Sequence, residues 1–165
     1  MKRTLTLTFL IVLIMLNACR QTSTQEQLQG VWQLRSMDII NRAEADNDYR
    51  FMIEEANMMG LYFGMNGLMF RNNKDLVFIR DGFNLYEDYK LGYRLLGRDG
   101  RLNENGRTIE VLLLQSPVEF EGLSEPPGPF EILSLSADEL ILKDLNPYTV
   151  DITKNNMALR FSRVE

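Results

Sequence analysis

The chain from Gly30 onward is a series of short apolar runs separated by turn residues, and this spacing constrains the fold more than any other feature. The clearest run covers residues 89–95, where Tyr or Leu at every second position alternates with Lys, Gly and Arg. A period of two is typical of a strand with one buried face. Turn sequences such as Asp81-Gly82 separate the runs. About eight or nine strands in antiparallel order are expected, which predicts an all-β fold, a small up-and-down barrel.

One stretch, Asp46–Met59, has a helical pattern instead. Asp48 is a suitable N-cap for a short helix over residues 48–59. The residues on its shared face would be Tyr49, Met52, Ile53 and Ala56. An irregular crossover is the alternative for this segment.

Three further segments lead to specific expectations. Asn66-Gly67 favours a two-residue hairpin turn, because both positions accept positive φ. Thr108–Gln115 is apolar on both faces, so we expect it to be covered on both sides. Residues 116–130 hold four of the five prolines and are expected to form a loop.

The N-terminus has the pattern of a signal segment. Lys2 and Arg3 precede an apolar run from Leu5 to Leu16 that is broken only by threonines. The run is about a dozen residues long, whereas a membrane-spanning helix needs about 20. It therefore predicts a signal segment rather than a permanent membrane span.

The end of this segment, Leu16-Asn17-Ala18-Cys19, resembles the lipobox of bacterial lipoproteins. In that family a lipid is attached to the cysteine sulfur, and the chain is cut so that the cysteine becomes its first residue. Several acyl chains hold a protein durably on a membrane, whereas one gives marginal binding. The resemblance implies a signal peptide over 1–18, a lipidated tether over 19–27 and a folded domain over 28–165.

The domain itself resembles the lipocalin fold at both of its ends. "LQGVWQL" carries a Gly-x-Trp opening at Gly30 and Trp32, and the matching positions near the end are Ile132, Leu135, Leu140, Leu142, Phe161 and Arg163. The resemblance implies a barrel closed at one end by Trp32, with Arg163 packed over the indole as a cation–π pair. A different small β-domain of bacterial lipoproteins, the META type, opens with a similar stretch and is the alternative fold.

Charge and composition exclude several classes of function. Net charge is −5, and about −7 once residues 1–18 are removed, so nucleic acid would be repelled. The chain has no histidine and only one cysteine, Cys19. Histidine-based catalysis and histidine or cysteine metal sites are therefore excluded. We expect no cofactor, no metal and no enzymatic activity.

Paired carboxylates are the remaining candidates for catalysis. They are Glu54-Glu55, Asp138-Glu139, and Glu119 with Glu121. All lie in expected loops, turns or a helix face, where acids are ordinarily solvated. Glu110 lies within an apolar strand, where it needs Arg35 or Arg94 as a partner if it points inward, and none if it faces solvent.

Methionine and tyrosine side chains are the candidates for lining a ligand cavity. Methionines cluster between residues 52 and 69, and flexible thioethers suit either an irregular core or a surface that binds varied apolar ligands. Tyrosines on strands offer an apolar ring with a polar hydroxyl. The candidate ligand-binding residues are Tyr62, Tyr89, Tyr93, Met65 and Met69.

Together these features predict a lipoprotein of the outer membrane, on its periplasmic face. In the lipoprotein pattern, Asp after the cysteine is associated with inner-membrane retention, and this chain has Arg20 there. The first functional hypothesis is a non-catalytic barrel that binds a small apolar or amphipathic ligand. The alternative is an interaction subunit of an envelope complex, with a filled barrel and partner contacts through loop 116–130, near Phe120, Leu123 and Phe130.

Overall fold

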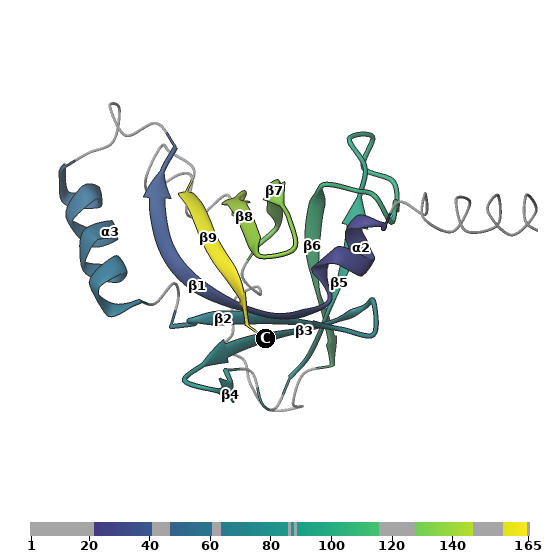
Figure 1. Cartoon of the computed structure of the whole chain (residues 1–165), viewed down its shortest axis with the longest axis horizontal. Coiled ribbons are helices and arrows are strands. Elements are labelled where there is room, and N and C mark those ends of the chain that lie inside the picture. Colours follow the sequence, from purple (N-terminus) through teal and green to yellow (C-terminus); the bar gives the residue numbers. More distant parts are fainter. Residues whose placement is uncertain are drawn as a thin grey trace, which may run out of the picture.

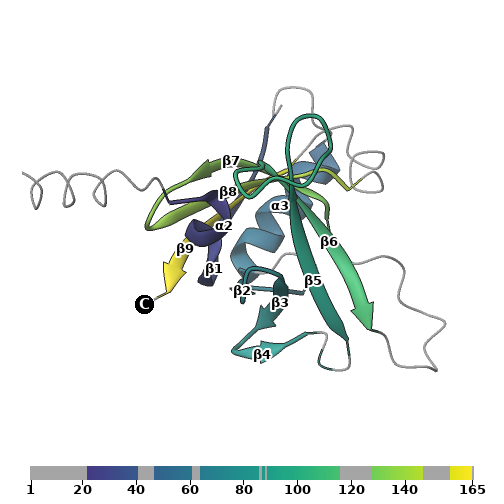
Figure 2. The same ribbon diagram turned by 90° about the vertical axis from the view of Figure 1, so that its right-hand side faces the viewer.

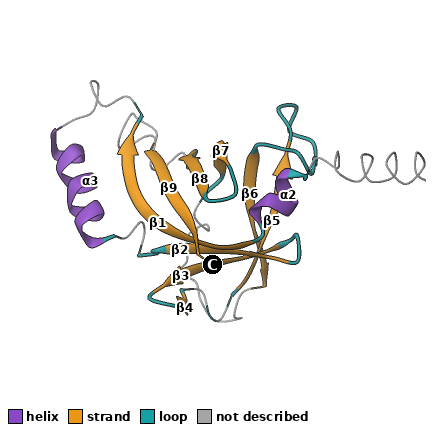
Figure 3. Cartoon of the chain, viewed as in Figure 1, coloured by secondary structure: helices purple, strands orange, loops and turns teal. Residues whose placement is uncertain are grey.

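The structure is a computed structural model, and it describes residues 22–40, 47–60, 64–85, 87, 89–115, 128–146 and 157–164. Cys19, Tyr62, Phe120 and Leu123 lie outside these residues. Strands dominate the described chain, with a short helix at one side and a longer helix at the other (Figures 1 and 3).

Eight strands form a closed antiparallel barrel, which confirms the predicted fold class. The ring of neighbours runs β1-β9-β8-β7-β6-β5-β3-β2 and returns to β1, while the short β4 pairs with β3. The strands are β1 Gly30–Ile39, β2 Gly67–Arg71, β3 Asp75–Arg80, β4 Phe83–Asn84, β5 Lys90–Leu96, β6 Thr108–Gln115, β7 Phe130–Leu135, β8 Glu139–Asp144 and β9 Met157–Val164.

The hairpin between β2 and β3 turns at Asn72 and Asn73, and the prediction of a turn at Asn66-Gly67 is wrong. Asn72 and Asn73 have φ of 50° and 57°, the left-handed values that a two-residue hairpin turn needs. Gly67 is already paired with Gln33 and Ile79. A Cβ at Gly67 would lie 3.0 Å from the carbonyl oxygen of Trp32, so glycine is needed there for close strand packing.

The strands of the barrel are paired over very different lengths. β3 and β5 share one residue pair, and β6 pairs with β7 only at Thr108 and Ile109. The expectation that Thr108–Gln115 is covered on both sides is therefore wrong, and Leu113 and Leu114 are each 49% exposed. Beyond Ile109, β6 has no described pairing with β7, and its last three residues, 113–115, are exposed.

One contiguous apolar core fills the barrel. Its largest side chains with almost no exposure are Trp32, Phe70, Phe78, Phe130 and Phe161, and they come from five different strands. Phe130 is 1% exposed, so its expected place in an exposed patch is wrong. It begins β7, where it pairs with Ile109 and Asp144.

The first helix, α2 (Thr24–Leu28), lies where the tether was expected to continue to residue 27. Ser23 and Glu26 form a reciprocal capping box, and Leu28 is fully buried in the core. The Thr24 amide donates a hydrogen bond to the side-chain oxygen of Asn105, and the Gln25 amide donates one to the Glu104 carbonyl. Within the described residues, these contacts attach α2 to the folded domain.

The second helix, α3 (Asn47–Met59), confirms the predicted helical segment and excludes the irregular crossover. It begins at Asn47, so Asp48 lies in its first turn and is not the N-cap. Ile53 is buried and Ala56 packs against the core, but Met52 is 58% exposed, so the predicted apolar face is wrong at that position. Helices α2 and α3 lie at opposite ends of the molecule, and α3 is behind in Figure 2, which faces α2.

Candidate functional site

Two of the predicted ligand-binding side chains, Met65 and Tyr93, are packed into the core. Met65 is 1% exposed and Tyr93 is 3% exposed. The Tyr93 ring meets the Phe70 ring edge-on, with 4.9 Å between centroids. Its hydroxyl accepts a hydrogen bond of 2.8 Å from Nε2 of Gln29. These side chains fill space in the barrel and tie β5 to the segment that follows α2.

The other predicted ligand-binding residues do not join them. Met69 lies on β2 between the buried Leu68 and Phe70, so it points to the other face of the strand. There its sulfur accepts a hydrogen bond from Nε of Arg71 at 2.6 Å. Tyr89 is partly buried against the edge of the core. Tyr62 lies outside the described residues.

The environment of Tyr93 raises its pKa. Burial disfavours the charged phenolate and is the largest cause; the Gln29 hydrogen bond acts in the opposite direction, and the Asp75 carboxylate adds a smaller rise. The folded state thus favours the protonated form. The stability that Tyr93 provides is fully present below about pH 10, its unfolded pKa, and is lost as the pH rises through the folded pKa.

We therefore expect Tyr93→Phe to reduce the dependence of stability on alkaline pH. At about pH 8 the variant should be about 1 kcal/mol less stable than the wild type, because Nε2 of Gln29 loses its hydrogen bond to Tyr93 and keeps only the one to the Gln25 carbonyl. Towards about pH 11 this gap should narrow, because only the wild type must keep a buried phenol protonated. Urea unfolding at both pH values measures the gap. A gap that stays constant would contradict the raised pKa.

Trp32, Arg163 and Gly30 lie together, and Arg163 stacks on the indole in the cation–π pair that the lipocalin resemblance implies. Trp32 is fully buried, and its Nε1 donates a 2.7 Å hydrogen bond to the Leu28 carbonyl. The Arg163 guanidinium carbon lies 4.2 Å from the indole ring centroid. Gly30 has φ of 116°, and a Cβ there would lie 2.9 Å from Nη1 of Arg163.

The guanidinium of Arg163 also binds three backbone carbonyls. Nη1 donates to Gln29 and Nη2 to Gln27, each at 2.5 Å, and Nε donates to Ala137 at 2.6 Å. These contacts join β9 to α2 and to the turn between β7 and β8. The Trp32–Arg163 pair therefore stabilises the fold. Its nitrogen donors are already hydrogen-bonded to backbone carbonyls.

Asn57 of α3 binds the backbone of β1 where β1 is no longer paired with β2. This residue was not identified from the sequence. β1 pairs with β2 only as far as Gln33, with one further hydrogen bond from Leu34 to Asn66. Beyond it, the Asn57 carboxamide accepts from the Met37 amide at 2.6 Å and donates to the Met37 carbonyl at 2.7 Å. One side chain thereby occupies the position of a strand neighbour along the free edge of β1.

Two hollows lie beside these elements. A small one of about 180 Å³ follows the seam between α3 and β1 and is lined by Asp38, Arg50, Glu54 and Asn57 with apolar neighbours. A more open cleft of about 460 Å³ lies between residues 96–108 and residues 131–133. The first is smaller than the roughly 300 Å³ at which ligand pockets usually begin. The second is lined by the loop between β5 and β6 together with residues of β7, and it is not an interior cavity of the barrel.

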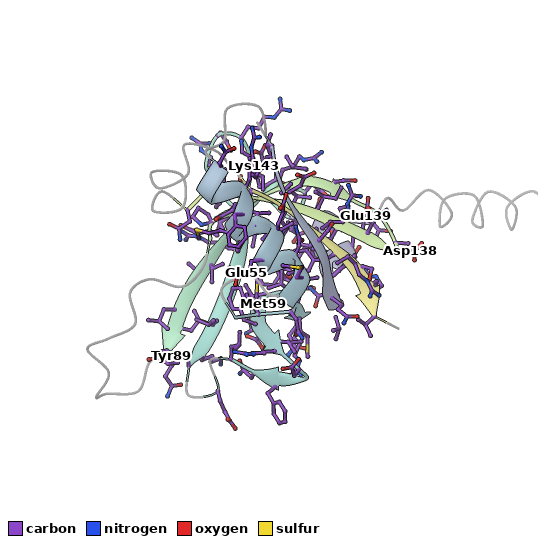
Figure 4. All side chains as sticks on the ribbon, turned by 90° about the vertical axis from the view of Figure 1, so that its left-hand side faces the viewer. Glu55, Met59, Tyr89, Asp138, Glu139 and Lys143 are labelled. Carbon is purple, nitrogen blue, oxygen red and sulfur yellow. The ribbon has the colours of Figure 1, made fainter. Side chains whose placement is uncertain are left out.

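Among the described residues, the candidate carboxylates do not gather at one place, and Glu119 with Glu121 lies outside these residues. Figure 4 shows Glu55 on α3, far from Asp138 and Glu139. Glu139 forms an ion pair with Arg160, and Glu110 forms one across the strands with Arg94, whose pKa is raised by that hydrogen bond. Both pairs are partly exposed. Within the described ranges, no group of three or more acidic side chains could hold a metal ion.

Comparisons with known proteins do not place this chain. No protein-family model, no curated protein and no solved structure matches it. Among the described residues, neither helix is long and apolar enough to cross a membrane. Function must therefore be argued from the residues themselves.

Proposed function

We propose that this protein is an outer-membrane lipoprotein whose filled barrel serves as a non-catalytic interaction subunit. The observation that carries the proposal is the packed interior: the barrel holds one contiguous apolar core, and Met65 and Tyr93 belong to it. An eight-stranded barrel can be filled or hollow, and side chains fill this one. The packing favours the interaction subunit over the ligand-binding barrel, which stays a prediction.

The lipid anchor would orient the domain. Cys19 precedes Ser23, the cap of α2, by four residues, which span at most about 14 Å when fully extended. With a lipid on Cys19, the α2 end of the barrel faces the membrane closely. Helix α3 lies at the opposite end (Figure 1), so on this proposal it faces the periplasm. Because Arg20 rather than Asp follows Cys19, the outer membrane is the proposed location.

The mass of the chain purified from its own cells tests both parts of this proposal. We expect a chain that begins at Cys19 and carries covalent acyl groups, with no other adduct in native mass spectrometry. Lipidation needs the cysteine sulfur, so Cys19→Ser should lose the acyl mass completely. Among the described residues, apolar side chains fill the interior of the barrel, so we expect no small-molecule mass that disappears on adding organic solvent.

Two results would contradict the proposal separately. An acyl-free wild-type mass would overturn the lipid anchor while leaving the filled barrel intact. A small molecule retained by both wild type and Cys19→Ser, and released by solvent, would instead restore the ligand-binding barrel.

A further inference from the structure

The outward face of α3 is apolar although it is open to solvent. Phe51, Met52, Met58 and Met59 are 64%, 58%, 80% and 59% exposed. With Glu55 they follow the spacing i, i+1, i+4, i+7 and i+8, so they form one stripe on the helix. We call these five residues the α3 outer face. Figure 4 shows Glu55 and Met59 on the helix nearest the viewer.

The opposite side of α3 makes the contacts that attach the helix to the barrel. Ile53 and Ala56 pack on the core, and Asn57 holds β1. Four exposed large apolar side chains amount to an area on the order of 500 Å², taking about 200 Å² for each when isolated. A patch of this size is comparable to the largest apolar patch on a typical monomer, and such patches are often functional. The α3 outer face is therefore suited to binding rather than to stability.

Glu55 defines what kind of partner fits. It lies at the centre of the stripe, and the ion pairs found among the described residues do not include it. A partner that covered the stripe would desolvate this carboxylate, which is costly unless a cation pairs with it. Methionine side chains adapt to varied apolar shapes, and such surfaces commonly receive amphipathic helices.

A second copy of the chain fits less well. A two-fold antiparallel pairing of the stripes would bring Phe51 against Met59 and Met52 against Met58, but it would also oppose Glu55 to Glu55. Two buried carboxylates repel each other strongly.

A membrane also fits less well. Interfacial helices carry Lys and Arg on the polar side, whereas α3 carries three acids against one base. On the proposed function, α3 also faces away from the anchoring membrane.

We propose that the α3 outer face binds an amphipathic helix of another envelope protein, with a Lys or Arg of that helix paired with Glu55. This inference rests on the proposed function of an interaction subunit and names the surface that it uses. The interface is small, and its specificity comes from the one charge at its centre.

Photo-crosslinking in the cells that make the protein tests this directly. The full chain carries p-benzoylphenylalanine at position 58 or, as a control, at position 83, which is also exposed but lies on β4. We expect a crosslinked protein only from position 58. Its crosslinked peptide should have an amphipathic helical pattern with a Lys or Arg on the apolar face.

Charge exchange then separates specific pairing from general apolar contact. Glu55→Lys should lower the yield about tenfold or more, and changing the partner's basic residue to Glu should restore it. Glu104→Lys makes the same change in net charge at the opposite end of the molecule, beside α2, and should leave the yield unchanged.

Each other outcome would overturn the inference. An adduct of twice the chain mass would show self-association, and a lipid adduct would show a membrane contact. If no adduct forms, the α3 outer face is not a binding surface. If Glu55→Lys does not change the yield, Glu55 does not pair with a cation of the partner. The native mass measurement is independent of position 58, so failure of the lipid anchor or of the filled barrel is recognised separately.

Discussion

Trp32→Ala is expected to lower the free energy of unfolding by about 4 kcal/mol. Replacing a fully buried tryptophan by alanine typically costs about 3–5 kcal/mol, because the lost apolar contacts leave a cavity. Here the Leu28 carbonyl and the Arg163 guanidinium also lose their contacts with the indole. Because Trp32 is the only tryptophan, unfolding in urea should be followed by circular dichroism rather than by intrinsic fluorescence.

A double-mutant cycle with Arg163→Ala separates stacking from simple burial. If the cation–π contact contributes, the double variant should be less destabilised than the sum of the single variants, by about 1 kcal/mol. Trp32→Phe is the intermediate control, since it keeps a smaller aromatic ring and removes the Nε1 donor. A loss below about 1 kcal/mol for Trp32→Ala would show that this end of the barrel repacks without the stack.

The barrel could be predicted because its signal is local and repeated. The alternation over residues 89–95 predicts a strand, and the structure has β5 there with Leu91, Tyr93 and Leu95 buried. A period of two records which residues face the core, so it survives without knowledge of the partner strands. The contact between Trp32 and Arg163, far apart in sequence, was implied only by resemblance to a family with that arrangement.

Pairing between strands is where prediction from sequence failed. Asn66-Gly67 and Asn72-Asn73 are both plausible turns by residue type, and only the register of β2 with β1 and β3 decides between them. Likewise, the apolar run Thr108–Gln115 indicated burial on both faces. Whether β6 keeps a neighbour beyond Ile109 depends on where β7 lies, which a single strand does not record.

The helices show the same division between local and distant information. The capping box of α2 is a local pattern, Ser23-x-x-Glu26, and it predicts a helix within the segment expected to be a tether. In α3, Asn57 follows the buried Ile53 by four residues, so a polar residue on the packed face was a visible signal. The sequence could not predict its partner, the edge of β1, because that edge depends on where the pairing of β1 with β2 ends.

Asn57→Ala is expected to release α3 from the barrel. The substitution leaves the Met37 amide and carbonyl without their partner at the free edge of β1, which costs about 2 kcal/mol of local stability. Amides of α3 and of residues 34–39 should then exchange with deuterium about thirtyfold faster, while those of β8 and β9 stay protected. Hydrogen exchange with mass spectrometry measures both groups in one experiment.

Two further variants decide whether the carboxamide itself holds the helix. Asn57→Asp has nearly the same shape and can still accept from the Met37 amide, but it cannot donate to the Met37 carbonyl. It should therefore open α3 at least as much as alanine does, because it turns a donor into a charge facing an oxygen. Met58→Ala, on the exposed face of the same helix, should leave exchange unchanged. If all three variants exchange like the wild type, then Ile53 and Ala56 hold α3 by apolar packing alone, and the edge of β1 does not need Asn57.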